Sequence, residues 1–284
     1  MKQQILFSAS ELHSALKSKA CIVFDCRFVL NDPGSGYKDY LDAHIPGAVY
    51  AHLDHDLSSP ISCVSGRHPL PDADEFAAFL ADSGWQPGIR LVAYDNAGGS
   101  IAARLWWLMK YFGHDGGALL DGGISSWQSA GYEMQSGRVK VKPAVPVSFS
   151  PRSELLVSTS EILESLGGQD SLLVDVRDSK RYRGEVEPID TVAGHIPGAV
   201  NYPFQMNLSP DGKFKSSAEA GKGLCTLSAK HQAQNMVYMC GSGVTACHTI
   251  FAAELAGLEN SKLYAGSWSE WIRDPSRPIV SHEG

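Results

Sequence analysis

The hexapeptide HIPGAV at residues 44–49 recurs without change at residues 195–200. Three further pairs of similar segments accompany it, in the same order in both places. They are SASELHSAL at 8–16 and STSEILESL at 158–166, IVFDCR at 22–27 and LLVDVR at 172–177, and DGGISSW at 121–127 and AGSWSEW at 265–271. The offsets in chain order are 150, 150, 151 and 144 residues, and four collinear matches indicate a tandem duplication of one domain.

The length of 284 residues fits two domains, because one domain usually takes roughly 100 to 200 residues. Between the copies lies VKVKPAVPVSFSPRS, which contains three prolines. Proline fixes φ and disfavours helix in the residue before it, so this segment is expected to be an extended linker. We therefore predict a first domain at 1–138, a linker at 139–153 and a second domain at 154–284.

Each copy shows the same expected order of helices and strands. A first helix is expected to be capped by Ser10 in one copy and by Ser160 in the other, with an acidic residue next. Short apolar strands are expected at 21–24, 89–95 and 117–121, and at 172–174, 235–240 and 261–265. Strands that alternate with helices predict an α/β fold, in which each copy is a parallel sheet flanked by helices.

The composition excludes several classes of protein. Hydrophobic residues make up 43% and charged residues 19%, as in ordinary globular proteins. The net charge of -7, without clusters of Lys and Arg, argues against nucleic acid as a partner. A run of about 18 apolar residues, which a membrane span needs, is missing, and so is the apolar stretch of a signal peptide. We therefore expect a cytoplasmic protein with no membrane partner.

The stretch NMVYMCGSGVTACHTIFAAE, residues 235–254, joins an expected strand to an expected helix through Cys240. Ligands of parallel α/β sheets bind at the carboxyl ends of the strands, where this cysteine lies. The turn glycines let several backbone N–H groups face inward, and the helix adds the positive end of its dipole. This environment favours the thiolate over the thiol, so Cys240 is the predicted nucleophile. At the same place the first copy has Asp95, which marks it as the inactive copy.

The N–H groups that surround the predicted thiolate are also expected to bind the substrate. They belong to Gly241, Gly243, Val244 and Thr245. The other cysteines are expected to be buried structural residues: Cys21, Cys26, Cys63, Cys225 and Cys247. The absence of Cys-x-x-Cys pairs argues against a zinc site, and no nucleotide or flavin motif is visible, so neither metal nor cofactor is expected.

The two copies, with HIPGAV twice, CGSGVTAC and SWSEW, resemble the two-domain rhodanese-type sulfurtransferases over nearly the whole chain. The loop CGSGVTA resembles the branch that uses 3-mercaptopyruvate, because the thiosulfate branch usually has Arg-Lys where this chain has Gly241 and Ser242. The resemblance implies that Cys240 takes sulfur from 3-mercaptopyruvate as a persulfide and releases pyruvate. A thiol, a thioredoxin-like protein or cyanide is then the expected acceptor.

The resemblance also implies roles for polar side chains. Ser242 matches a loop serine that bonds the substrate or donates a proton, although a serine here also suits a turn. His44 matches a histidine proposed to act with that serine and an aspartate, for which Asp32 is a candidate. Because His195 occupies the same place in the second copy, a structural role for both histidines is the alternative.

Arg181, in SKRYRGE, matches the family arginine that binds the anionic group of the substrate. The mercaptopyruvate branch usually has a second arginine where this chain has Ile189, and Arg183 is a candidate replacement. Asp190 at the next position is more like the thiosulfate branch. Thiosulfate is therefore the alternative donor. Arg177 is expected to pair with a nearby carboxylate, because DCR occupies the same place in the first copy.

Two functions from other classes fit parts of this pattern. A cysteine-dependent phosphatase needs an arginine six positions after its cysteine, but this chain has Ala246 there. Turnover of an aryl phosphate would favour that class. A binding module or sulfur relay without small-molecule turnover is the other candidate, although such a module would not need to keep Cys240. A persulfide that reacts only with one partner protein would favour it.

Overall fold

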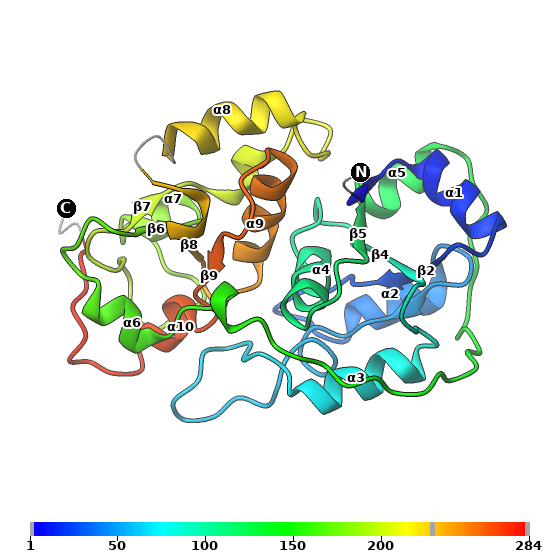
Figure 1. Cartoon of the computed structure of the whole chain (residues 1–284), viewed down its shortest axis with the longest axis horizontal. Coiled ribbons are helices and arrows are strands. Elements are labelled where there is room, and N and C mark those ends of the chain that lie inside the picture. The colour runs from blue at the N-terminus through cyan, green and yellow to red at the C-terminus, as the bar shows by residue number, and fades with distance from the viewer. Residues whose placement is uncertain (1–2, 228–230, 282–284) are drawn as a thin grey trace. The chain divides into compact units, whose positions relative to one another are not determined.

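Each repeat contains the parallel sheet that its alternating strands and helices predict (Figure 1). The computed structural model describes residues 3–227 and 231–281. Within these residues, five strands of the first unit pair in the order β1-β5-β4-β2-β3, and every pairing is parallel. The elements of this unit are β1 (Leu6–Phe7), α1 (Ala9–Lys17), β2 (Cys21–Asp25), α2 (Ser35–Asp42), β3 (Val49–Tyr50), α3 (Ala73–Asp82), β4 (Arg90–Tyr94), α4 (Ala102–Tyr111), β5 (Gly117–Leu120) and α5 (Gly123–Ser129).

The second unit repeats this plan with four described strands in the parallel order β7-β6-β8-β9. Helix α9 packs against β8 and β9 (Figure 1). The elements are η1 (Ser153–Leu155), α6 (Thr159–Glu164), β6 (Leu172–Asp175), α7 (Ser179–Tyr182), β7 (Val200–Asn201), η2 (Phe204–Asn207), α8 (Ser217–Leu227), η4 (Ala233–Asn235), β8 (Met236–Met239), α9 (Thr245–Leu255), β9 (Lys262–Leu263) and α10 (Ser267–Trp271). The α/β fold with two parallel sheets is therefore confirmed.

The boundary between the units differs in detail from the predicted domains. The first unit comprises 1–59, 70–152 and 210–213, and the remaining residues form the second unit. Thus residues 60–69, from the first repeat, pack with the second unit. The corresponding segment of the second repeat, residues 210–213, packs with the first unit. Simple repeat boundaries do not reveal this exchange of segments.

The first helix of each repeat starts two residues earlier than expected. The caps are Ser8 and Ser158, so the expectation for Ser10 and Ser160 was wrong. Ser8 Oγ accepts the N–H of Glu11 at 3.3 Å, and the Glu11 carboxylate accepts the N–H of Ser8 at 2.8 Å. This reciprocal capping box satisfies two free N–H groups of the first turn, and the second repeat forms the same box.

The repeated HIPGAV segment supplies a core residue and a tight turn in each unit. Ile45 and Ile196 have no exposed surface and belong to the two hydrophobic cores. In both copies the N–H three residues later bonds the isoleucine carbonyl, at 2.9 and 3.1 Å. Burial of one isoleucine and closure of one turn explain why both copies need the HIPGAV segment.

The predicted pairing of Arg177 with a carboxylate is confirmed, because its Nη2 lies 2.6 Å from Asp175 Oδ2.

The turn after β4 in the first unit is closed around the carboxylate of Asp95, which is fully buried. Oδ1 accepts the N–H groups of Ala97 and Gly99 at 2.8 Å. Oδ2 accepts those of Ile101 and Ala102 at 2.8 and 2.9 Å. Four backbone donors thus converge on one anion at the position that corresponds to Cys240. The turn is a preformed anion site, and the first repeat fills it with its own side chain.

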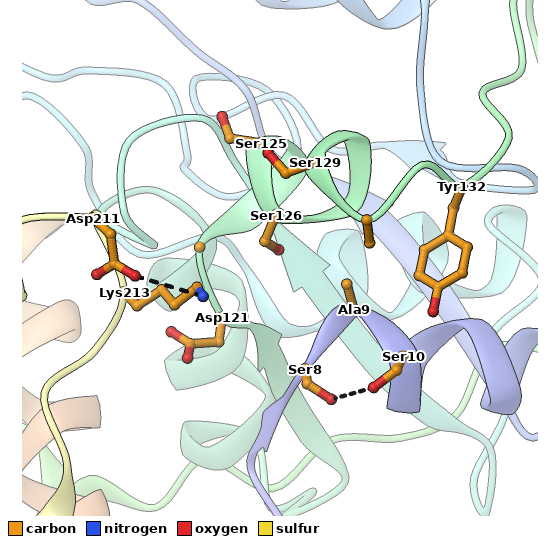
Figure 2. A pocket seen from close by; sticks show the side chains of 12 residues that line it. Ser8, Ala9, Ser10, Asp121, Ser125, Ser126, Ser129, Tyr132, Asp211 and Lys213 are labelled. Carbon is orange, nitrogen blue, oxygen red and sulfur yellow. Dashed lines mark hydrogen bonds and ion pairs between the residues drawn. The ribbon is translucent and has the colours of Figure 1, made fainter.

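A cavity of about 520 Å³ opens in the first unit between α1 and α5 (Figure 2). Ala9 and Ser126 line it, and their counterparts in the second repeat are Thr159 and Glu270. Those two side chains bond to each other, and Thr159 Oγ1 also bonds Tyr264 Oη at 2.8 Å. The cavity therefore lies where small side chains replace a hydrogen-bonded cluster.

Replacement of Asp95 by Ala should destabilise the protein strongly. It removes the shared acceptor of four N–H groups, so we expect the free energy of unfolding to fall by about 3 to 5 kcal/mol. Asp95→Asn keeps one acceptor oxygen, so its free energy of unfolding should lie between those of the parent and Asp95→Ala. Urea unfolding followed by circular dichroism measures both changes. An Asp95→Ala variant as stable as the parent would show that these four bonds contribute little to stability.

Candidate active site

Cys240 lies directly after β8, and only 2% of its surface is exposed. The start of α10 holds its backbone in place. The Cys240 N–H donates to Ser267 Oγ at 3.1 Å, and the Trp268 N–H donates to the Cys240 carbonyl at 3.0 Å. The next N–H, from Ser269, donates to the Gly241 carbonyl at 2.9 Å. The position of the cysteine is therefore set by a helix that follows it by 27 residues.

Ser267 has a φ of +53°, which is uncommon for a residue with a side chain. Its counterpart in the first repeat is Gly123, with a φ of +57°, so both copies need this backbone shape. The Ser267 hydroxyl donates to the Tyr264 carbonyl at 2.9 Å and accepts the Cys240 N–H. These bonds offset the backbone strain and are available only to the copy that carries the cysteine.

The two glycines of the turn have different roles. Gly243 has a φ of +75°, and a Cβ there would lie 2.4 Å from the Ala265 carbonyl oxygen. Gly241 lies outside the left-handed region. A Cβ at Gly241 would lie 3.0 Å from Arg67 Nη2 and 3.7 Å from Arg181 Nη2. Gly241 therefore leaves room for two guanidinium groups beside the nucleophile.

Ser242 follows, and its hydroxyl is bonded to a histidine that the sequence did not single out. His68 Nδ1 lies 2.7 Å from Ser242 Oγ, and both side chains are buried. His68 belongs to residues 60–69, the segment that packs with the second unit. The imidazole and the hydroxyl form a pair that can pass a proton next to Cys240.

His44 does not take this part in the structure. Its Nδ1 donates to the Tyr40 carbonyl at 2.6 Å, and its ring stacks on Tyr40 with centroids 4.3 Å apart. His195 makes the same two contacts with Tyr182, at 2.7 and 3.8 Å. These matching contacts agree with the alternative interpretation, in which both histidines have a structural role. The candidate aspartate, Asp32, lies in an exposed turn before α2.

Arg181, on α7, is joined to a second arginine through a shared carboxylate. Its Nη2 lies 3.0 Å from Asp190 Oδ2, while Arg67 Nη1 bonds Asp190 Oδ1. Arg67 immediately precedes His68 in the chain. Its Nε is buried and has no partner among the described residues. Two guanidiniums and one spare N–H donor therefore lie beside the cysteine loop.

A second carboxylate, that of Glu187, also bonds Arg181. Its carboxylate accepts Arg181 Nη2 at 2.7 Å and is reached by Arg177 Nη1 at 3.5 Å. Burial acts to raise the pKa of Glu187, but bonds from Arg181 and from the N–H groups of Asp190 and Ile189 outweigh it and hold the pKa below its usual value. Glu187 is therefore the ionised partner that orients Arg181.

The second arginine beside the cysteine loop is Arg67 and not Arg183, whose side chain is 43% exposed and pairs with Glu185. Sequence comparison within one segment cannot find it, because Arg67 comes from the other repeat. The sequence did contain one indication that His68 has a role of its own. At offsets of 150 and 151 the second repeat has Ala218 and Glu219, so this histidine occurs in one copy only. Catalytic residues of a half-active duplication should show this asymmetry.

The segment that carries Arg67 and His68 is held in place by contacts of three successive residues, which are Ser65, Gly66 and Arg67. The Ser65 carbonyl accepts Arg273 Nε at 3.2 Å. A Cβ on Gly66 would lie 2.6 Å from the Gly266 carbonyl oxygen, so only glycine permits this approach. The Arg67 N–H donates to Ser269 Oγ at 3.0 Å. Ser269 therefore bonds both the cysteine loop and the segment with the arginine and histidine.

The remaining cysteines divide by burial. Cys26 and Cys247 are buried, as expected, and Cys247 Sγ donates to the Gly243 carbonyl at 3.2 Å. Cys21 is partly buried, whereas Cys63 is exposed, so the expectation of a buried role for Cys63 was wrong. The Cys225 side chain lies outside the described part of the structure.

Among the described residues, no three His, Cys, Asp or Glu side chains gather closely enough to hold a metal ion. The described helices also include none that is both long and apolar enough to cross a membrane.

A family model described as the rhodanese-like domain matches residues 8–130 and again residues 158–274. The chain belongs to the rhodanese family. The two matches confirm both the duplication and the resemblance seen in the sequence. The two matched ranges place Asp95 in the first domain and Cys240 in the second.

Several rhodanese relatives are similar over most or nearly all of their length. A probable 3-mercaptopyruvate sulfurtransferase of Pseudomonas aeruginosa is 43% identical and covers 99% of each chain. A putative thiosulfate sulfurtransferase, SseB, of Mycobacterium tuberculosis is 35% identical and covers 97% of this chain and 96% of its own. The solved 3-mercaptopyruvate sulfurtransferase from Leishmania major is 30% identical with a TM-score of 0.84, over 96% of this chain and 76% of that one.

Ser269→Ala should weaken sulfur transfer without unfolding the protein. The change removes the acceptor of the Arg67 N–H but keeps the N–H that bonds Gly241, so we expect kcat/KM to fall about tenfold. Ser125→Ala is the matched control, because Ser125 is the exposed counterpart in the first repeat. Steady-state kinetics of both variants test this. Equal activity of the two would show that the Arg67 N–H bond does not position the segment.

Glu187→Gln should change stability in a pH-dependent way. The pKa of Glu187 is lower in the folded state than in the unfolded chain, so its charge stabilises the fold above the unfolded value of about 4.3. That stabilisation is lost as the pH falls through the folded value. We expect Glu187→Gln to lower the unfolding free energy by about 2 kcal/mol at pH 7 and by much less near pH 3. Urea unfolding across this pH range, with Glu185→Gln as control, checks the sign.

Proposed function

We propose that this chain moves a sulfur atom from 3-mercaptopyruvate to a thiol or cyanide acceptor through a persulfide on Cys240. One observation carries the proposal. The guanidiniums of Arg67 and Arg181 lie beside Gly241, the residue that follows the buried cysteine. A donor whose carboxylate bonds these groups has its sulfur directed toward Cys240. Relatives along the whole chain that are named as sulfurtransferases support this assignment.

The first half-reaction follows from the groups at the site. The Cys240 thiolate attacks the sulfur of 3-mercaptopyruvate, an S–S bond forms and the C–S bond breaks. The leaving group is the enolate of pyruvate, which needs a proton on its methylene carbon. The thiol hydrogen of the donor balances this proton, since the persulfide remains ionised. The Ser242 hydroxyl, bonded to His68, is placed to deliver it.

The second half-reaction returns the thiolate. A thiol or cyanide attacks the outer sulfur of the persulfide, the S–S bond breaks and Cys240 leaves as the thiolate. Both forms of the enzyme carry one negative charge at this turn. Backbone N–H groups of Gly241, Ser242, Gly243, Val244 and Thr245 are the proposed binding groups. The four N–H groups around Asp95 in the first repeat support this, because the corresponding turn there holds an anion.

Thiosulfate is the second candidate donor. The cysteine loop itself carries no cation, but Arg67 Nη2 lies 3.0 Å from the position of a Gly241 Cβ and supplies one from another segment. That positive charge favours a sulfonate as well as a carboxylate. Relatives named as putative thiosulfate sulfurtransferases are consistent with this alternative. Two donors therefore have to be compared directly.

For the acceptor, we infer a small thiol, a thioredoxin-like protein or cyanide, because the persulfide can react with any accessible thiolate. We also place the protein in the cytoplasm. Four described cysteines are free thiols, as in a reducing compartment: Cys21, Cys26, Cys63 and Cys240.

The test compares sulfur transfer to cyanide from 3-mercaptopyruvate and from thiosulfate. We expect the higher kcat/KM with 3-mercaptopyruvate, no turnover with Cys240→Ser and unchanged turnover with the exposed control Cys63→Ser. His68→Asn should lower kcat with 3-mercaptopyruvate about a hundredfold. Mass spectrometry of donor-treated protein should find one added sulfur on the peptide with Cys240. Activity in Cys240→Ser, or a loaded sulfur elsewhere, would refute the proposal, and preference for thiosulfate would reverse the choice of donor.

A further inference from the structure

The carboxylate of Asp190 lies between the two arginines that the proposed function assigns to the substrate. One oxygen bonds Arg67 Nη1, and the other lies 3.0 Å from Arg181 Nη2. The Asp190 side chain is only 4% exposed. A substrate carboxylate that bridged the same two guanidiniums would need the same two N–H groups. Asp190 therefore occupies the bonding positions that an anionic donor requires.

We propose that Asp190 is a specificity-determining residue, an internal carboxylate that competes with the donor for Arg67 and Arg181 and discriminates against doubly charged donors. This inference rests on the proposed function, because it concerns the donor of the same site. Thiosulfate carries two negative charges, whereas 3-mercaptopyruvate carries one. Repulsion by a fixed carboxylate grows with the charge of the incoming anion, so thiosulfate is penalised more.

The charges of the described side chains support this. Arg67 and Arg181 contribute two positive charges, and Asp190 and Glu187 contribute two negative charges, so the four side chains balance. Glu187 bonds Arg181 through Nε and Nη2, and it also bonds the Asp190 N–H at 3.1 Å. Asp190 is thus the carboxylate that bonds both guanidiniums, and its removal leaves the group with a net positive charge.

The donors at the site also suit an exchange of anions. Arg67 Nε is buried without a partner among the described residues, so one N–H is already available to a ligand. Two more become available when the Asp190 carboxylate is displaced from Arg67 and Arg181. Because Gly241 has no side chain, both guanidiniums keep their access to the cysteine loop. Binding of the donor therefore requires that the bonds of Asp190 to Arg67 and Arg181 are broken.

The experiment measures kcat and KM for both donors in the parent, in Asp190→Asn and in Asp190→Ala. We expect KM to fall about threefold for 3-mercaptopyruvate and about tenfold for thiosulfate, since the repulsion energy doubles with the charge. The ratio of the two kcat/KM values should therefore shift toward thiosulfate. Glu185→Gln is the matched control, because it removes one negative charge from an exposed position on the same loop, and its ratio should stay unchanged.

The outcomes separate this inference from the proposed function. If the parent and Glu185→Gln transfer no sulfur from either donor, the proposed function itself fails. If they are active but both Asp190 variants lose efficiency equally with the two donors, Asp190 only positions the arginines and the inference is wrong. An unchanged donor ratio overturns it as well. Thermal unfolding of each variant shows whether it is folded. Two different substitutions of Asp190 are made so that the inference is still tested if one variant does not fold.

Discussion

A convergence of backbone N–H groups at the turn after the central strand β4 is the constraint on which the first repeat is built, and the second repeat has a turn at the corresponding place. Buried N–H groups have to be paired, so this turn requires an acceptor at its centre. The first repeat supplies a permanent one, the carboxylate of Asp95, with four short bonds. The second repeat places Cys240 there, a residue whose sulfur can change its covalent partner. One side chain thus decides whether the turn is a structural element or a reaction centre.

The rest of the site is arranged around this turn by helix α10. Its first residues bond the backbone of Cys240 and Gly241, and Ser269 reaches the segment with Arg67 and His68. The strained backbone of Ser267 and the close approach of Gly66 to Gly266 are local costs of this arrangement. They bring a hydroxyl–imidazole pair and two guanidiniums to one buried thiol. Charge balance within this group comes from Asp190 and Glu187, which makes the site polar but neutral apart from its nucleophile.

Local and repeated signals made the fold predictable from the sequence. HIPGAV, the strand–turn–helix pattern around Cys240 and the alternation of elements all report short-range structure. They predicted two α/β domains, and the resemblance of these motifs implied the rhodanese fold. Arg181 was named because SKRYRGE resembles the family motif, and its partners Glu187 and Asp190 follow it by only a few residues. Arg67 and His68 were missed because their contacts span 123 and 174 residues, and no local pattern encodes such distances. His44 was named because it matches a histidine of the family, with a structural role as the alternative, and in the structure its ring stacks on Tyr40.

The exchange of residues 60–69 also bears on how a duplicated gene can evolve. A duplication normally leaves two interchangeable copies, either of which can be lost without harm. In the proposed site the two repeats contribute different residues, since Cys240 comes from the second repeat and Arg67 and His68 come from the first. Mutations that degrade either half are then exposed to selection, and deletion back to a single domain is no longer neutral. The loop that crosses from one repeat to the other thereby locks the duplication into the lineage.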